Sequence, residues 1–454
     1  MDLRPNSDEA RDIAYHFHGY TNARAHEDQG PMIMDRGEGV YVFDTQGNRY
    51  IEGMSGLWSV AVGFHEERLI KAATQQMSKL PYYHNFAHRS HGPAIDLAEK
   101  LISLAPVPMS KVFFTNSGSE ANNTILKMLW YRSNSLGKPE KKKVISRIRG
   151  YHGVTIASAS MTGLPYNHAS FDLPIDGVLH TTCPHYWREG QEGESEEAFA
   201  TRCADDLDAM IQAEGPDTIA AFIAEPVMGA GGVVVPPATY WEKIQAVLAK
   251  YDILLIADEV ICGFGRTGNM FGCETFGISP DIMTMSKQIT SSYFPFSAFM
   301  MTEEVYAPIA DESGRIGVLG HGYTGGAHPV GAAVALENLK IIEERDLVAN
   351  AAERGAELQA GLRGFAGHPR VGEARGVGLV GALEIIAPEG RSEDFKPGQL
   401  GLAMNKHFLK NGLISRNMLD AMAFCPPLIV TSDQVKDILS AVERSLEGFT
   451  AEMG

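Results

Sequence analysis

The sequence predicts an α/β fold, with a mostly parallel sheet in a large domain and a smaller α+β domain beside it. Between residues 60 and 325, short apolar runs alternate with helical stretches, which is typical of a parallel sheet covered by helices on both faces. The chain has 454 residues, more than one hydrophobic core usually spans, so we expect at least two domains. After residue 326 the pattern changes to long helical stretches and a mixed tail.

The first expected element is a β-hairpin made by residues 39–43 and 48–52. The turn-type sequence Asp44-Thr45-Gln46-Gly47 joins its two apolar runs. In the large domain, the apolar periodicity of residues 240–250 predicts a helix. The expected strands of this domain cover residues 111–115, 144–148, 218–224, 253–257 and 282–286.

The last part of the chain is expected to begin with two helices, at residues 331–345 and 351–362. Strands are expected at residues 376–385 and 413–415. We therefore place the large domain at residues 60–325 and build the small domain from both ends of the chain, residues 1–59 and 326–454.

Composition excludes several classes of partner. Lys and Arg number 39 against 56 Asp and Glu, for a net charge of −17, which argues against nucleic acid. No apolar run approaches the ~20 residues that a membrane span needs, so we expect no membrane partner. The five cysteines form no CxxC pair, which favours a reducing, cytoplasmic location. We expect no metal site.

A glycine-containing turn follows the strand expected at residues 111–115. Ser117, Gly118 and Ser119 lead from that strand into a helix. Gly118 allows close approach of the backbone, and the helix N-terminus offers free N–H groups with a partial positive charge, so the turn suits a phosphate. Taken alone, the turn is more typical of a plain strand-to-helix connection with a serine cap.

Two charged residues lie at the C-terminal ends of expected buried strands further along the chain. Asp258 ends the run Leu254-Leu255-Ile256-Ala257, and Lys287 follows Ile282-Met283-Thr284-Met285-Ser286. A buried Asp needs a partner, which is either a structural donor or a cation such as a protonated ring nitrogen. A buried Lys has a lowered pKa and becomes a nucleophilic amine, unless it simply reaches solvent at the strand end.

The phosphate turn, the Asp and the Lys are informative together. Ligands bind beyond the carboxyl ends of parallel strands, and all three features lie at such ends. Pyridoxal phosphate needs a phosphate anchor, an anion opposite its ring nitrogen and a lysine that bonds to it covalently. The sequence therefore predicts a pyridoxal phosphate site.

With these residues in view, the sequence resembles the class III pyridoxal-phosphate-dependent aminotransferases, and within them the omega-transaminase group. Motifs over nearly the whole chain carry the resemblance: Asn48-Arg49-Tyr50-Ile51-Glu52-Gly53, Gly56-Leu57-Trp58, Arg149-Gly150-Tyr151-His152-Gly153, Ala224-Glu225-Pro226-Val227, Gly263-Phe264-Gly265-Arg266-Thr267-Gly268, Ser286-Lys287 and Gly320-His321-Gly322-Tyr323-Thr324. It implies fold type I with a seven-stranded-type sheet.

The resemblance also implies roles for single residues. Lys287 would bond to the cofactor, Asp258 would pair with its ring nitrogen, and Glu225 would lie beside the ring. The other implied cofactor contacts are Ser117, Gly118 and Ser119 on the phosphate, Tyr151 and Val260 on the two ring faces, His152, and Thr324 reaching across from the neighbouring subunit. The chain would therefore be a homodimer with shared active sites, and a tetramer stays open.

For the substrate, the resemblance points to Arg416 as the residue that grips a carboxylate, a task that suits a guanidinium. The pocket would be lined by Tyr20, Leu57, Trp58, Phe86 and Tyr151. Phe294 and Phe296 depart from the family pattern, and either reshape the pocket or fill the core.

The implied function is transfer of an amino group from an amine or omega-amino acid to a keto acid such as pyruvate, giving alanine. The alternatives left open are another class III activity (aminomutase, decarboxylase or racemase) and a non-catalytic ligand-binding protein on the same fold.

Overall fold

The structure of the chain is a computed structural model that describes residues 4–453. Its largest sheet has seven strands in the order β4-β10-β9-β8-β7-β5-β6. All pairs are parallel except those of β10, which runs antiparallel to both β4 and β9. The strands are β4 (Lys111–Thr115), β5 (Lys143–Arg147), β6 (Val178–Thr181), β7 (Ile219–Ala224), β8 (Leu254–Asp258), β9 (Ile282–Met285) and β10 (Ser297–Met301).

The predicted α/β class is confirmed, and the five expected strands appear within a residue or two of their expected bounds. The two that sequence reasoning missed, β6 and β10, have four and five residues. In β6 two of the four residues, His180 and Thr181, are polar, so no continuous apolar run marks this strand. In addition, β10 lies antiparallel between β4 and β9, so no crossover helix marks its approach.

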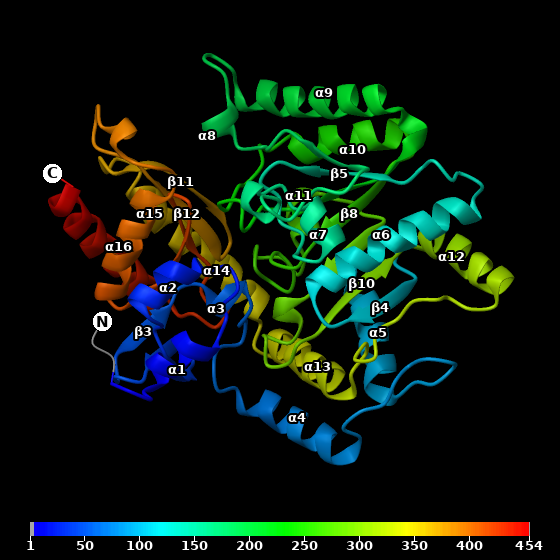
Figure 1. The fold of residues 1–454 in the computed structure, drawn as a ribbon, viewed down its shortest axis with the longest axis horizontal. Coiled ribbons are helices and arrows are strands. Elements are labelled where there is room, and N and C mark those ends of the chain that lie inside the picture. Colours follow the sequence, from blue (N-terminus) through cyan, green and yellow to red (C-terminus); the bar gives the residue numbers. More distant parts are fainter. Residues whose placement is uncertain (1–3, 454) are drawn as a thin grey trace.

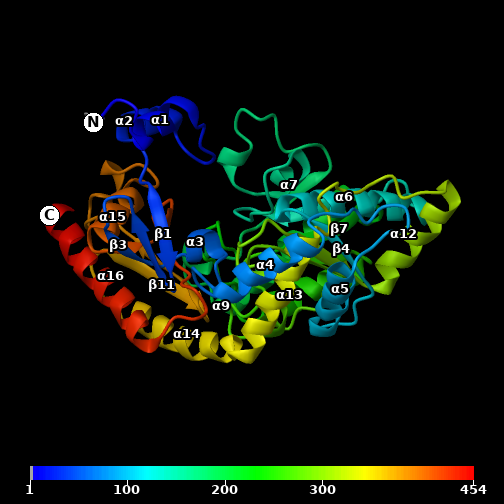
Figure 2. The same cartoon turned by 90° about the horizontal axis from the view of Figure 1, so that it is seen from below.

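Helices cover both faces of this sheet (Figures 1 and 2). Alternate strand residues face opposite ways: Ile223 and Ile256 pack with α6, α7 and α12, whereas Phe222 and Leu255 belong to the core that α9, α10 and α13 complete. The helices are α4 (Glu67–Lys79), α5 (Gly92–Leu104), α6 (Gly118–Ser135), α7 (Ile156–Met161), α8 (Tyr186–Glu189), α9 (Glu196–Glu214), α10 (Tyr240–Lys250), α11 (Gly272–Phe276), α12 (Glu303–Ile316) and α13 (Pro329–Glu344).

Two four-stranded sheets lie beside this layered body. The first, β1-β2-β3-β13, contains the expected hairpin, and β13 pairs with β3 in parallel, so segments near both chain ends share a sheet. The second has the order β11-β12-β15-β14. The strands are β1 (Met34–Glu38), β2 (Tyr41–Asp44), β3 (Arg49–Glu52), β11 (Val371–Val377), β12 (Val380–Ile385), β13 (Leu413–Ile414), β14 (Arg416–Met418) and β15 (Ala421–Phe424).

The remaining helices are α1 (Asp8–Tyr15), α2 (Ala23–Gln29), α3 (Ser55–Trp58), α14 (Leu347–Gly364), α15 (Gln399–Lys410) and α16 (Ser432–Met453). The expectation of one strand over residues 376–385 was wrong: β11 and β12 form a hairpin that turns at Gly378. Gly378 has φ +53°, and a Cβ there would lie 2.6 Å from the Arg266 carbonyl oxygen, so glycine is needed at this turn. The domain boundaries at residues 60 and 325 stay a prediction.

Arg266 connects the two parts of the molecule. It is fully buried, and its guanidinium donates to the carbonyl oxygens of Leu379 and Pro426 on one side and to Gln288 Oε1 (3.2 Å) on the other. Burial away from water lowers the pKa of this guanidinium. All five cysteines are free and buried. Within residues 4–453, no helix is both long and apolar enough to cross a bilayer.

Glu52, on β3, should make the stability of the fold depend on pH. Burial raises the pKa of its carboxyl to about 7, although the Met54 N–H donates to it at 2.9 Å. This folded-state pKa lies above the ordinary value of 4.5, so the folded state favours the protonated carboxyl. The contribution of Glu52 to the free energy of unfolding is therefore fully present below pH 4.5 and is lost as the pH rises through 7.

We therefore expect the free energy of unfolding of Glu52→Gln, relative to that of the parent chain, to rise by about 2 kcal/mol between pH 5.5 and pH 8.5. The measurement is the difference between the two proteins in free energy of unfolding, or in Tm, at each pH. Glu38→Gln, at an exposed position of the same sheet, is the matched control and should show no such gain. A difference for Glu52→Gln that stays constant with pH would contradict the assignment.

Candidate active site

The carboxyl ends of five strands meet at one edge of the seven-stranded sheet. β5, β7, β8 and β9 are parallel, and β4 points the same way because it pairs antiparallel with β10, as β9 does. The residues that follow these strands include Ser117, Tyr151, Glu225, Asp258 and Lys287. The topology therefore gathers at one edge the side chains that the sequence singled out.

Asp258 is held in a fixed orientation by two side chains. Its Oδ2 accepts a hydrogen bond from Asn122 Nδ2 at 2.8 Å and one from His152 Nδ1 at 2.8 Å. Thr284 Oγ1 donates to Asn122 Oδ1 at 2.8 Å and so orients the amide. Among residues 4–453, the other oxygen, Oδ1, accepts only the backbone N–H of Val260, at 3.2 Å. One carboxylate oxygen therefore retains capacity to face a cation.

Sequence reasoning missed Asn122. The feature that could have identified it is its position in α6: Asn122 is a polar residue one turn after Gly118, and it is buried on the face that packs on the sheet. A buried amide on an apolar face needs partners, and here Asp258, Thr284 and the His152 carbonyl oxygen supply them.

Glu225, at the end of β7, organises the loop that carries Tyr151. Its Oε1 accepts the Tyr151 backbone N–H and its Oε2 that of Gly229, each at 2.9 Å. Burial raises the pKa of this carboxyl, and the nearby His152 opposes the rise. The carboxyl thus fixes the backbone of Tyr151 beside Asp258.

Lys287 has a strained backbone and an unpaired amine. Its φ is +49°, the left-handed region that non-glycine residues seldom adopt. Burial lowers the pKa of its amine, and the carboxylates of Asp258 and Glu225 oppose that shift. Among the described residues, none accepts a hydrogen bond from Nζ. The next residue, Gln288, donates to the Ile261 and Gly263 carbonyl oxygens at 2.8 Å each and so anchors the segment.

The start of α6 has the features of an anion site. Ser117 caps the helix, with its Oγ accepting the Glu120 N–H at 3.2 Å. Within the described part of the chain, the N–H groups of Gly118 and Ser119 find no acceptor. A Cβ on Gly118 would lie 3.1 Å from Val260 Cγ2, so the turn lies against the segment that follows Asp258. These residues fit pyridoxal phosphate, because free N–H groups, a free carboxylate oxygen and an unpaired lysine lie at one edge.

Arg416 and Tyr20 reach this edge from elsewhere in the chain. The ring centroids of Tyr20 and Tyr151 are 6.4 Å apart, and Asn167 Nδ2 donates to the Tyr20 hydroxyl at 2.6 Å. Burial, followed by Tyr20, raises the pKa of Tyr151, whereas Arg416 opposes this rise. Arg416, on β14, is also close enough to lower the pKa of Lys287. It has no carboxylate partner among the described residues.

The other expected pocket residues lie in different surroundings. Trp58 is buried in an apolar cluster with Ile261 and Cys425. Leu57, Phe86 and Thr324 are exposed in the single chain. The Thr324 carbonyl oxygen accepts the Tyr82 hydroxyl at 2.9 Å. No hydrogen bond or ring contact joins these three residues to Lys287 or Asp258 within the part of the chain that the structure describes.

Phe294 and Phe296 pack where α13 begins. Phe296 is buried against Phe114, with ring centroids 5.5 Å apart, and Phe294 lies 4.9 Å from the His328 ring. A Cβ on Gly331 would come within 2.4 Å of Phe296 and 2.8 Å of Phe294. Both rings therefore fill the space beside a glycine of α13.

Comparison with known proteins agrees with this geometry. The family model of aminotransferase class-III matches residues 22–446. A probable gamma-aminobutyrate transaminase 3, mitochondrial, from Oryza sativa subsp. indica is 49% identical over 416 residues, which are 91% of this chain and 81% of that protein. Gamma aminobutyrate transaminase 1, mitochondrial, from Solanum lycopersicum is 47% identical over 421 residues, covering 92% of this chain and 82% of the relative.

Solved structures are similar over nearly all of the chain. The omega transaminase from Pseudomonas jessenii in complex with PMP is 59% identical, with a TM-score of 0.97, covering 99% of both chains. A transaminase solved with L-Ala is 65% identical, with a TM-score of 0.92, covering 93% of this chain and 100% of that one. On this evidence the chain belongs to the class III aminotransferases, enzymes that depend on pyridoxal phosphate.

Proposed function

We propose that this chain is an omega transaminase, which moves an amino group from an amine or omega-amino acid to a keto acid such as pyruvate and releases alanine. The observation that carries the proposal is Arg416. It is half-buried and without a carboxylate partner among the described residues, yet close enough to act on the pKa of Lys287, Tyr151 and Tyr166. A half-buried guanidinium in that situation calls for an anionic ligand.

The similar proteins support both halves of the proposed reaction. The curated relatives are named gamma-aminobutyrate transaminases, so their donor is an omega-amino acid. One of the similar structures was solved with L-Ala, which in a transaminase is the amino partner of pyruvate.

Bound pyridoxal phosphate supplies a carbonyl carbon that takes the amino group and a ring that accepts electrons from the substrate Cα. Asp258 Oδ1 would hold the ring nitrogen in its protonated state, because a carboxylate beside it favours the charged form. Asn122 and His152 keep Oδ1 in place by holding Oδ2. The N–H groups of Gly118 and Ser119 would bind the phosphate.

Lys287 has two tasks in this reaction. Its lowered pKa makes the neutral amine available to bond to the cofactor. When it is not bonded to the cofactor, the same nitrogen would move the proton at the substrate Cα as a general base and acid. Arg416 would orient the keto acid by its carboxylate, and Tyr20 with Tyr151 would provide the apolar wall of the pocket.

We further propose a homodimer in a reducing, cytoplasmic compartment. Thr324 is exposed in the single chain, as a residue that completes a neighbouring subunit's phosphate site must be. All five cysteines are buried and unpaired, which suits a reducing environment.

The function is tested by supplying the holoenzyme with a panel of amines and omega-amino acids, with pyruvate as the common acceptor, and measuring alanine. We expect alanine from at least one donor class. An enzyme that retains its cofactor but forms no alanine across the panel would overturn the proposal.

Lys287→Ala should abolish turnover, because no other lysine among residues 4–453 follows a strand at this edge, where it could bond to the cofactor or move the Cα proton. We expect a loss of at least about 10⁴-fold in kcat, with the phosphate turn still binding cofactor noncovalently. Lys143→Ala, at the opposite end of the sheet, is the control. Substantial activity in the Lys287 variant would exclude the assigned role.

Asn122→Asp should place a second carboxylate against Asp258 Oδ2. The two acids would then share a proton, which weakens the negative charge facing the ring nitrogen. We expect kcat to fall at least tenfold with little change in KM for the amine, together with a shifted pH profile. Asn123→Asp, one position along α6 and bonded to Thr155 instead, should leave kcat and the pH profile unchanged. Equal behaviour of the two variants would refute the role of Asn122.

Arg416→Ala should separate the two half-reactions. Loss of charge-assisted hydrogen bonds to a carboxylate costs about 1.5–3 kcal/mol, so we expect a 10- to 100-fold rise in KM for pyruvate. The half-reaction with a neutral amine should change by less than about threefold. Arg391→Ala, which removes an exposed ion pair with Asp394, is the control. An equal loss in both half-reactions would count against carboxylate binding by Arg416.

A further inference from the structure

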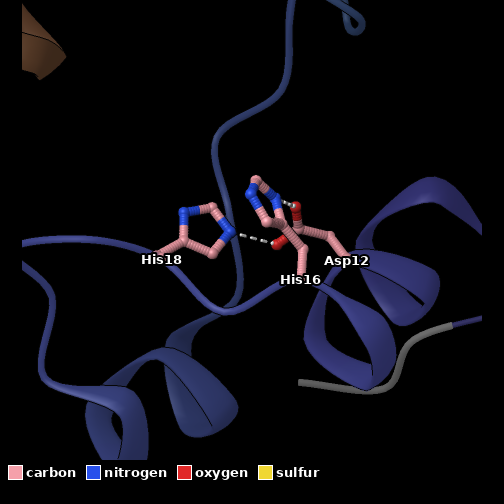
Figure 3. A group of neighbouring side chains, drawn as sticks. All are labelled: Asp12, His16 and His18. Atoms are coloured by element: carbon pink, nitrogen blue, oxygen red, sulfur yellow. Dashed lines mark hydrogen bonds and ion pairs between the residues drawn. The ribbon is translucent and has the colours of Figure 1, made fainter.

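Three histidines near the N-terminus converge on one carboxylate, in the segments on either side of Tyr20. Asp12 lies on α1, His16 and His18 follow that helix, and His26 lies on α2 (Figure 3 shows the first three). The Asp12 contacts are 3.2 Å from Oδ2 to His16 Nδ1, 2.7 Å from Oδ1 to His18 Nε2, and 3.0 Å from Oδ1 to His26 Nε2.

The local sequence explains this convergence. Asp12 and His16 are four residues apart, which places them on the same side of a helix turn. His16 ends the helix in an extended conformation, with φ −108° and ψ 112°, and His18, two residues further on, reaches the same carboxylate. The rings of His16 and His18 have centroids 4.2 Å apart, and those of His18 and His26 4.3 Å.

Hydrogen bonding alone accounts poorly for such a cluster. His16 is 66% exposed and His18 28% exposed, and contacts of this kind in water contribute little to stability. A cleft of about 210 Å³ lies beside the cluster, lined in part by His16, His18 and His26. The group is therefore open to an ion arriving from solvent.

We propose that Asp12, His16 and His18 bind one divalent transition-metal ion, with His26 holding the carboxylate in position. Their ligand atoms lie within 4.8 Å of one another, and ligands of a tetrahedral Zn²⁺ ion are about 3.3–3.6 Å apart, given bonds of about 2.0–2.2 Å. Imidazole and carboxylate together suit Zn²⁺, Ni²⁺ or Cu²⁺ rather than Mg²⁺ or Ca²⁺.

Binding requires a movement of protons within the rings and a small separation of the side chains, because His18 Nε2 and Asp12 Oδ1 now lie 2.7 Å apart. His16 and His18 now direct N–H groups at Asp12; on binding, each ring carries its proton on the other nitrogen and gives its lone pair to the metal. His26 keeps its hydrogen bond to Asp12 Oδ1, the orienting role that outer partners of ligating carboxylates fulfil. A water molecule completes the four ligands.

The site would fix the segment that carries Tyr20. Residues 16–26 leave α1 at His16, place Tyr20 beside Tyr151 and return to the cluster at His26. Tyr20 itself has φ +51°, a conformation that needs support from its surroundings. A metal that joins His16 and His18 to Asp12 would hold one end of this segment.

The first test is zinc binding by untagged holoenzyme freed of metals with a chelator, dialysed against micromolar ZnCl₂ and assayed for bound zinc. We expect one Zn²⁺ per chain, at least tenfold weaker binding in His18→Gln and in Asp12→Asn, and no competition from Mg²⁺. His407→Gln, which removes a single histidine–carboxylate pair with Glu452, should bind zinc as the parent does. Zinc bound equally well by His18→Gln, or not retained by the parent at 100 µM, would overturn the site.

A second measurement needs no variant, and so decides the question even where a substitution impairs folding. Co²⁺ added to the unmodified holoenzyme should give d–d absorption bands between about 500 and 650 nm, away from the absorption of the cofactor, that saturate at one equivalent per chain. Hydrogen exchange of residues 16–26 should slow when Zn²⁺ is added. Absence of the bands at one equivalent would contradict the proposal, whatever the substrate of the enzyme proves to be.

Discussion

The geometry of the active site depends on one buried carboxylate held by two side chains. Asp258 ends a fully buried strand, where an unpaired charge would be costly. Asn122 and His152 satisfy one of its oxygens, and the other remains available to the cofactor. The same requirement ties α6 to β8, because the amide that satisfies Asp258 comes from that helix and is itself oriented by Thr284. The same contacts therefore stabilise a buried charge and orient the carboxylate that would face the cofactor.

A second constraint joins the sheet to the parts of the chain that lie outside it. Gln288 follows Lys287 and accepts a hydrogen bond from the buried guanidinium of Arg266, which also donates to the Leu379 and Pro426 carbonyl oxygens. A buried guanidinium needs hydrogen-bond acceptors, and those of Arg266 come from the segment after β9 and from the segments around β12 and β15. The packing of these two parts around Arg266 brings Arg416, on β14, close enough to Lys287 to lower the pKa of its amine.

Sequence reasoning predicted what depends on local pattern. The strands that end at Thr115 and Asp258, the helix at Tyr240–Lys250 and the early hairpin follow from apolar periodicity and turn chemistry. It missed β6, which is half polar, and β10, which lies antiparallel and so has no crossover helix before it, and it merged β11 with β12. Asn122 also escaped notice, because the need for a polar group on that face of α6 arises only once Asp258 lies opposite.

By itself, the sequence determined which chemical groups close the buried strands, because the order of a phosphate turn, an acid and a lysine along one alternating pattern allows few interpretations. Only the tertiary structure decided which of them meet. Strand order carries the ends of β4, β8 and β9 to one edge, and the sheet that holds Arg416 docks there through contacts between residues far apart in the chain. The cluster of Asp12 with three histidines needed the structure for the same reason: His26 joins it only because α2 folds back against α1.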